Sequence, residues 1–190
     1  MHESTNDTNV AIWRGNRTRK SHSSKRDAFA SPNEGPIAIV KEKIDWKTKY
    51  KATTKNTELK AGFDSKIAMV WAHPGLNVED WENMTSGKNG LVIAGTGLGH
   101  INSELLEIVR KTTKDTPVVM SSQCLSGSTN LNVYRNGRKL LNCGVVETYD
   151  MLPETALVKM MWLSKHYPND IKEKMGESLA GEISNSRKLN

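Results

Sequence analysis

The chain has 190 residues, of which 36% are hydrophobic and 25% are charged, and its formal net charge is +6. Its apolar runs are far shorter than the roughly 20 residues that cross a membrane, and its first residues lack the pattern of a signal peptide. Two cysteines, Cys124 and Cys143, with no C-x-x-C pair, argue against a disulfide scaffold and a zinc module. We therefore expect a cytoplasmic protein with one ordinary domain, or one domain and part of another.

Two short strands and a basic loop are predicted in residues 1–40. Apolar residues at 9–13 and 37–40 favour the strands, and turn-forming residues at 31–36 precede the second one. Residues 18–26 are basic and rich in hydroxyl groups without apolar periodicity, which indicates a loop. Two strands cannot form a core alone, so residues 1–40 are expected to be the C-terminal part of a larger N-terminal α/β domain.

Residues 41–65 are rich in lysine and threonine and have weak periodicity, which predicts a linker with room for one edge strand. From residue 66 onward, short apolar strands are predicted at 67–71, 91–94 and 117–120. Helical patterns are predicted at 78–84, and at 102–113 with Asn102 as its N-cap and a Glu107–Lys111 pair. Continuously apolar strands separated by a helix are typical of a parallel sheet covered on both faces.

The remaining chain predicts two further helices. Residues 133–134 and 139–141 flank turn chemistry at Asn136-Gly137, and 143–146 favours a short strand or turn. Pro153 opens a helix that runs to about residue 166. A last helix ends near Met175, where Gly176 fits its C-terminal cap. The fold class predicted for residues 66–190 is therefore a flavodoxin-like α/β domain.

The glycine-rich turn Gly95-Thr96-Gly97-Leu98-Gly99 follows one of these strands, as in dinucleotide-binding proteins. That fingerprint requires G-x-G-x-x-G, and His100 occupies the position of the third glycine. No acidic residue ends the next strand, which reads Met120-Ser121-Ser122-Gln123, so a ribose partner is absent. These differences disfavour nicotinamide and flavin cofactors, and we interpret the turn as a structural element of the domain.

A cluster of basic residues lies near the N-terminus. Lys20, flanked by other cations, is a candidate for proton transfer. Arg17, Arg19 and Lys25 would attract a polyanion such as RNA. A phosphate-binding loop and a plain solvated surface are alternatives, and the plain surface is favoured because few aromatic residues are interleaved to stack bases. The five histidines have no metal-ligand spacing.

These motifs resemble the bacterial-type asparaginase and glutaminase family. Lys20, followed by Phe29, Ser31-Pro32-Asn33 and Gly35-Pro36-Ile37, resembles the catalytic-lysine loop of that family, and Gly95–Gly99 resembles the turn of its second domain. The similarity is closer to the archaeal branch formed by the D-type subunits of Glu-tRNA(Gln) amidotransferases. The residues that carry it are Arg14-Gly15, Arg19-Lys20, His22, Ser24, Arg26-Asp27-Ala28-Phe29, Pro74-Gly75-Leu76, Ser122-Gln123-Cys124, Asn132-Val133-Tyr134, Gly137-Arg138, Leu140-Leu141 and Met151-Leu152-Pro153-Glu154-Thr155-Ala156-Leu157-Val158-Lys159.

The resemblance implies an amidohydrolase that frees ammonia from glutamine or asparagine. The family uses a threonine nucleophile in a Thr-Gly-Gly-Thr type turn and a second threonine activated by a lysine, which Lys20 matches. In the amidotransferase branch, ammonia passes to a kinase/transferase partner, the E-type subunit, which converts Glu-tRNA(Gln) to Gln-tRNA(Gln) with ATP and Mg. No cofactor is implied for this chain itself, and a homodimer is implied.

The chain departs from this pattern before Lys20, where neither threonine motif is found; Thr5 and Thr8 have no glycine-rich context. We therefore expect an N-terminally truncated chain that is inactive alone. His100 and Tyr134 match positions at which stand-alone asparaginases place Asn and Glu at a neighbouring subunit's substrate, so both are predicted substrate-binding residues. The alternatives are a fragment of a cytoplasmic L-asparaginase and a non-catalytic remnant that binds a partner or RNA.

Overall fold

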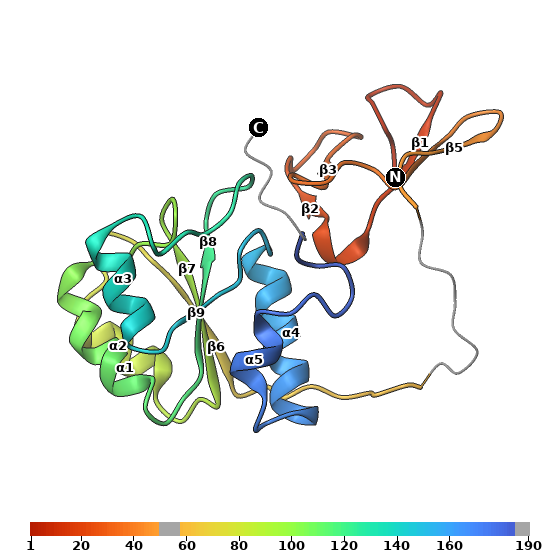
Figure 1. Ribbon diagram of the computed structural model, residues 1–190. Helices are drawn as coiled ribbons and strands as arrows, with labels where there is room; N and C mark the ends of the chain where they lie inside the picture. Colours follow the sequence, from red (N-terminus) through yellow and green to blue (C-terminus); the bar gives the residue numbers. More distant parts are fainter. Residues whose placement is uncertain (50–57, 185–190) are drawn as a thin grey trace. The chain divides into compact units, whose positions relative to one another are not determined.

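The computed structural model describes residues 1–49 and 58–184. The chain divides into two compact units, which comprise residues 1–59 and residues 60–190 and are called the small unit and the large unit below (Figure 1). The predicted domain limits of 1–40, 41–65 and 66–190 remain a prediction. None of the helices in the described residues is long and apolar enough to cross a bilayer.

The small unit contains a three-stranded antiparallel sheet in the order β1-β4-β5. Its strands are β1 (Val10–Ile12), β4 (Ala38–Val40) and β5 (Ile44–Trp46). The first two confirm the strands predicted near residues 9–13 and 37–40, and β5 is the edge strand for which the predicted linker had room.

A short hairpin corrects the prediction that residues 18–26 are a loop throughout. A single 3-10 turn, η1 (Gly15–Arg17), leads into β2 (Arg19–Lys20), which pairs with β3 (Phe29–Ala30). The backbone N–H of Ser21 donates to the carbonyl of Ala28 at 2.7 Å and closes the pair. The basic residues after Lys20 form the connecting loop, so the loop prediction holds only for that part.

The large unit is built on a four-stranded sheet in the order β6-β7-β8-β9, and every pair of neighbours is parallel. The strands are β6 (Ile67–Trp71), β7 (Gly90–Gly95), β8 (Val118–Ser122) and β9 (Val146–Glu147). Since the strands follow one another in sequence, right-handed crossovers place all connecting helices on one face. The prediction of an α/β domain with a covered parallel sheet is confirmed.

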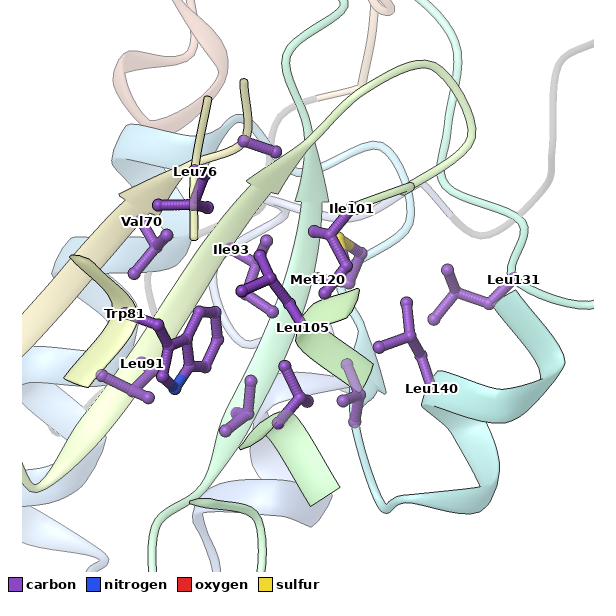
Figure 2. Packing of buried hydrophobic residues seen from close by; sticks show 14 residues of the cluster. Val70, Leu76, Trp81, Leu91, Ile93, Ile101, Leu105, Met120, Leu131 and Leu140 are labelled. Atoms are coloured by element: carbon purple, nitrogen blue, oxygen red, sulfur yellow. The ribbon is translucent and has the colours of Figure 1, made fainter. Parts of the chain in front are cut away.

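Helices cover both faces of this sheet, as Figure 1 shows. The connecting helices on one face are α1 (Val78–Thr85), α2 (Leu106–Thr112) and α3 (Arg135–Asn142), and the helices on the other are α4 (Pro153–His166) and α5 (Ile171–Met175). The core beneath α1, α2 and α3 includes the fully buried Trp81 (Figure 2), whose indole N–H donates to the Thr112 hydroxyl at 3.1 Å. Val92, Val119, Met160 and Leu163 belong to the second core, beneath α4 and α5. All six residues of β7 are buried, which explains its continuously apolar sequence.

Helix α3 overturns the prediction of two segments around a turn at Asn136-Gly137. The helix is continuous, and Gly137 lies inside it because the backbone of Leu131 packs against its Cα. A Cβ at this position would lie 2.3 Å from the Leu131 carbonyl oxygen. The glycine therefore permits a close backbone approach and does not form the expected turn.

The predicted helix at 102–113 also differs in detail. It begins as a 3-10 turn, η2 (Ser103–Leu105), before α2; Asn102 occupies the predicted N-cap position, but its side chain makes no capping hydrogen bond. The Asn102 side-chain amide instead donates to the carbonyls of Pro74 at 3.1 Å and Leu76 at 3.0 Å, which ties the turn after β6 to the start of this helix. Glu107 forms its ion pair with Arg110 at 2.7 Å, not with the predicted lysine.

The segment that leads into β6 packs along α4. The indole N–H of Trp162 donates to the Lys60 carbonyl at 2.9 Å, and the Ser164 hydroxyl donates to the Asp64 carboxylate at 2.6 Å. The hydrogen bonds from Ser164 and from the Asn89 amide lower the pKa of Asp64. The last part of the predicted linker therefore makes its contacts within the large unit.

A buried ion pair fastens the segment after α5 to α4. Lys159 and Glu182 are 8% and 3% exposed, and the Lys159 Nζ lies 2.6 Å from Glu182 Oε1. The ammonium also donates to the carbonyls of Met175 and Glu177, while the Glu182 carboxylate accepts the N–H groups of Leu179 and Ala180. All three ammonium protons of the lysine therefore have acceptors.

Candidate active-site residues

The glycine turn after β7 closes on itself and presents His100 at its end. Thr96 and His100 exchange backbone hydrogen bonds of 2.9 Å in both directions. Gly97 and Gly99 have φ angles of 52° and 106°, in the left-handed region that residues with a Cβ rarely adopt. The glycines are therefore required by the backbone path of the turn, as the structural interpretation of this motif predicted.

The residues that follow β8 hold this turn in place. The Ser122 hydroxyl donates to the Gly97 carbonyl at 2.6 Å, and the Gln123 backbone N–H donates to the Gly95 carbonyl at 2.8 Å. The Gln123 side-chain amide donates to the carbonyls of Ala94 and Ala72 at 2.8 and 2.5 Å, and so joins the ends of β6, β7 and β8.

The role of Gln123 in joining these strand ends is not predicted from the sequence. The available signal was a polar amide directly after an apolar strand, within the Ser122-Gln123-Cys124 motif.

His100 and Tyr134, both predicted to bind substrate, lie next to each other in the large unit. Their ring centroids are 5.0 Å apart, and the planes meet at 67°, an edge-to-face contact. Tyr134 precedes α3 and is 56% exposed. The structure therefore brings these two residues together, while their contact with substrate remains a prediction.

Leu131 anchors the segment that carries Tyr134. Its side chain is fully buried, and its N–H donates to the Glu147 carboxylate at 2.8 Å. Its carbonyl packs against Gly137, as described above, so both sides of this backbone are fixed. The buried Glu147 at the end of β9 and Gly137 in α3 together fix the backbone that leads to Tyr134, the residue before α3.

Two hollows adjoin His100. One, of about 490 Å³, is lined by residues that include His73, Thr96 and Glu104. The other, of about 630 Å³, is lined by residues that include Tyr134 and Arg135. Imidazole, hydroxyl, carboxylate and guanidinium groups provide both donors and acceptors, which suits a small polar molecule that carries an amide or a carboxylate.

Lys20 lies in the small unit, on the short hairpin. It pairs with Phe29 across the hairpin, and its Nζ lies 5.8 Å from the centroid of that ring. In the following loop, the Nδ1 of His22 accepts the backbone N–H groups of Ser24 and Lys25, both at 3.1 Å. The hairpin and the loop capped by the His22 imidazole thus hold the backbone of the exposed Lys20 in a defined conformation, which suits a lysine that transfers a proton.

The three predicted RNA contacts occupy different environments. Lys25 is exposed and Arg19 is half-buried. Arg17 is only 5% exposed, and its guanidinium lies 3.4 Å from the carboxylate of Glu34, which also pairs with Arg14. This burial argues against Arg17 as an RNA contact. Among residues 1–49 and 58–184, no group of three or more His, Cys, Asp and Glu side chains is arranged to hold a metal ion.

Each of the two units of the chain matches one family model. The family described as "Glutaminase/Asparaginase C-terminal domain" matches residues 66–175, and "Asparaginase, N-terminal" matches residues 2–52. The chain belongs to the glutaminase/asparaginase family.

Among its relatives are the D-type subunits of two glutamyl-tRNA(Gln) amidotransferases. The one from Thermoplasma acidophilum is 42% identical over 96% of this chain and 45% of its own length, and the one from Saccharolobus solfataricus is 42% identical over 96% and 43%. The chain therefore spans less than half the length of these relatives. Among solved structures, the L-asparaginase from Thermococcus kodakarensis matches with a TM-score of 0.87 and 33% identity, over 93% of this chain and 56% of that one. L-asparaginase I from Vibrio cholerae matches with a TM-score of 0.82 and 31% identity, over 92% and 55%.

Proposed function

We propose that the chain is the glutamine-amide-hydrolysing part of a tRNA-dependent amidotransferase, which supplies ammonia for the conversion of Glu-tRNA(Gln) to Gln-tRNA(Gln). The observation that carries this proposal is the 42% identity to two D-type amidotransferase subunits along 96% of the chain. The two asparaginases are 33% and 31% identical over a similar share of the chain, which favours the amidotransferase branch over the alternative of an L-asparaginase.

The proposed chemistry divides between the two units. Lys20 on the hairpin takes a proton from a threonine hydroxyl. The threonine oxygen attacks the carbonyl carbon of the substrate amide, the C–N bond breaks, and the proton passes to the nitrogen, which leaves as ammonia. Water then releases the acyl group as the free acid. His100 and Tyr134 contact the amino-acid portion of the substrate through the imidazole and the phenol. Gln123 and Glu147 hold the turn and the segment that present them. In this scheme the described residues bind and orient the substrate and move one proton.

The proposed partners follow from the amidotransferase assignment. A kinase/transferase subunit of the E type would receive the ammonia and use ATP and Mg to activate the glutamyl end of the charged tRNA. Two copies of the chain would associate, because the family places second-domain residues at a neighbouring subunit's substrate. Size-exclusion chromatography tests both associations. The elution of the chain alone is compared with its elution in the presence of the E-type subunit and in the presence of tRNA.

Ammonia release tests the proposal. The sequence before Lys20 contains no threonine in a glycine-rich turn, so the purified chain should not hydrolyse glutamine detectably. Glutamine hydrolysis by the purified chain, if it is lost in the Lys20→Ala variant, would refute the prediction that the chain is inactive alone.

A hybrid in which the chain is joined to the unaligned part of the Thermoplasma acidophilum relative should hydrolyse glutamine in preference to asparagine. This activity should disappear in Lys20→Ala and persist in the neighbouring variant Lys25→Ala. A preference for asparagine would instead support the asparaginase alternative.

A further inference from the structure

Residues 60–64 are fixed on the C-terminal half of α4 by hydrogen bonds. The indole N–H of Trp162 donates to the Lys60 carbonyl at 2.9 Å, and the Nε2 of His166 lies 3.2 Å from the Gly62 carbonyl oxygen. The backbone of this short segment is therefore held against the helix, and its side chains start from defined positions.

The ring of Tyr167, directly after α4, brings two lysines together. The Nζ of Lys60 donates to the Tyr167 hydroxyl at 2.8 Å and lies 5.0 Å from the centroid of the ring. The Nζ of Lys174, on α5, lies 5.2 Å from the same centroid. The Tyr167 ring lies 5.4 Å from the ring of Trp162. Two ammonium groups from distant parts of the sequence thus flank one phenol ring.

Phe63 and Lys165 extend this cluster. Phe63 is 56% exposed, although the residues on both sides of it are fixed, since the N–H of Asp64 donates to the Met161 carbonyl at 2.9 Å. The exposed Lys165 runs beside Gly62, and its Cε lies 3.9 Å from the position that a Cβ on this glycine would take. The resulting surface combines three lysines with three aromatic rings. We call it the lysine–aromatic patch: Lys60, Phe63, Trp162, Lys165, Tyr167 and Lys174.

The charge of the patch is suited to an anionic partner. In the part of the chain that the structure describes, Lys165 and Lys174 form no ion pair with a carboxylate. The carboxylate of Asp64, in the segment itself, accepts hydrogen bonds from the Ser164 hydroxyl at 2.6 Å and the Asn89 amide at 2.8 Å. The positive charge of these two lysines is therefore available to a ligand.

The aromatic rings indicate which anion fits. Proteins bind single-stranded nucleic acids through cations that contact phosphates and aromatic rings that stack on bases. RNA in particular is recognised in unpaired segments, whose bases are free to stack. An acidic protein surface would use the lysines in the same way but would provide no base for the exposed ring of Phe63.

We propose that the lysine–aromatic patch binds an unpaired segment of RNA, in which the three lysines contact phosphates and Phe63 stacks on a base. The patch belongs to the large unit and is distinct from the basic loop that follows Lys20. The identification of this RNA as a tRNA rests on the proposed function, because a tRNA-dependent amidotransferase brings tRNA to the chain.

Binding of a fluorescently labelled single-stranded RNA of about 12 nucleotides to the full chain tests the inference. Anisotropy is measured over a series of salt concentrations, and a duplex of the same sequence should bind more weakly. Lys60→Ala and Lys174→Ala should each weaken binding and reduce the slope of log K against log salt by about 0.7, the value for one phosphate of a single strand. Phe63→Ala should weaken binding roughly fivefold or more without changing the slope, because stacking releases no counterion.

Matched controls lie on the other face of the sheet. Lys111→Ala, at an exposed position on α2, and Val78→Ala, at a 41% exposed position on α1, should change neither the affinity nor the slope. Lys174→Arg keeps the charge and should bind the RNA as the wild type does. Thermal melting of each variant establishes that it is folded.

Three outcomes would overturn the inference. They are absence of binding at low salt, patch variants that behave like the controls, and displacement of the RNA by polyglutamate as readily as by unlabelled RNA. The last would assign the patch to an acidic protein. Glutamine hydrolysis by the hybrid described above is measured separately. A hybrid that binds RNA but releases no ammonia would refute the proposed function and leave the patch intact, whereas ammonia release without RNA binding would refute the patch alone.

Discussion

Replacing Lys159 by methionine removes the cation of the buried ion pair while keeping the length of the side chain. The Glu182 carboxylate, 3% exposed, keeps its hydrogen bonds from Leu179 and Ala180 at 3.0 and 2.6 Å but loses the ammonium at 2.6 Å. Removing one partner of a buried pair destabilises a protein by about 3–5 kcal/mol, because an uncompensated charge stays buried. For a unit of this size, that corresponds to a fall in Tm of roughly 10–20 °C.

The pKa values of this pair agree with an ion pair that is both buried and well hydrogen-bonded. Burial lowers the pKa of Lys159, although Glu182 opposes the change. Burial pushes the pKa of Glu182 upward, but the hydrogen bonds from Lys159 and from backbone N–H groups outweigh it and leave that pKa below its ordinary value. The carboxylate therefore stays charged in the wild-type protein, and its protonation offers the variant a way to reduce the loss.

Thermal and urea unfolding, followed by circular dichroism, measure the effect. Lys165→Met, on an exposed lysine of the same helix, is the control and should change the free energy of unfolding by less than about 0.5 kcal/mol. The double variant Lys159→Met, Glu182→Gln should recover a large part of the loss, because a neutral amide oxygen still accepts the two N–H groups. A loss below about 1 kcal/mol, or a double variant no more stable than the single one, would refute the reasoning.

Gly137→Ala should destabilise the protein by about 1–3 kcal/mol in urea unfolding, because the new Cβ would lie 2.3 Å from the Leu131 carbonyl oxygen. Gly15→Ala, where an added Cβ meets nothing within 4 Å, should be nearly neutral, and equal effects would contradict the packing argument. The pKa of Asp64 is lowered on folding, so its contribution is present above pH ~4 and is lost as the pH falls through the folded-state pKa; Asp64→Asn should therefore flatten the acid side of a plot of Tm against pH, and an unchanged acid side would count against this. If RNA binds the basic loop, Lys25→Ala should weaken tRNA binding and reduce the slope of log K against log salt by about 1 in a gel-shift series, whereas an unaltered slope would exclude this contact.

The strands and the layers of the large unit could be predicted from sequence because their signal is local. Continuous apolar runs at 67–71, 91–94 and 117–120 reflect burial on both faces, which local composition encodes directly. Pro153 at the first position of α4 is equally local. The boundaries shifted by only one or two residues, as helix and strand ends commonly do.

The errors arose where a residue is chosen for a contact that is distant in sequence. Gly137 follows Asn136 as in a tight turn, yet its role is the close approach of Leu131. Asn102 has the chemistry of an N-cap, but its amide is used by carbonyls more than twenty residues earlier. Local patterns cannot reveal which of two compatible roles the tertiary structure selects.

In the candidate site, too, local sequence signals can be separated from contacts that only the tertiary structure determines. The proximity of His100 and Tyr134 was expected only through the family resemblance, because 33 intervening residues conceal it in the sequence. Arg17 lies among exposed cations in the sequence, and only the structure shows it buried beside Glu34. Burial of a charged residue depends on a partner, which composition does not identify.

The sequential strand order has a consequence for synthesis on the ribosome. With every connecting helix on one face, the described residues that cover the opposite face of β6, β7 and β8 include α4, α5, Met151 and Ile183, all of which are translated after the four strands. At about 5–20 residues per second, the chain from the end of β8 to the end of α4 takes roughly 2–9 s to make. During that interval the residues that bury Val92 and Val119 in the native state have not yet been made. The nascent large unit therefore exposes an apolar surface to which chaperones and other nascent chains can bind.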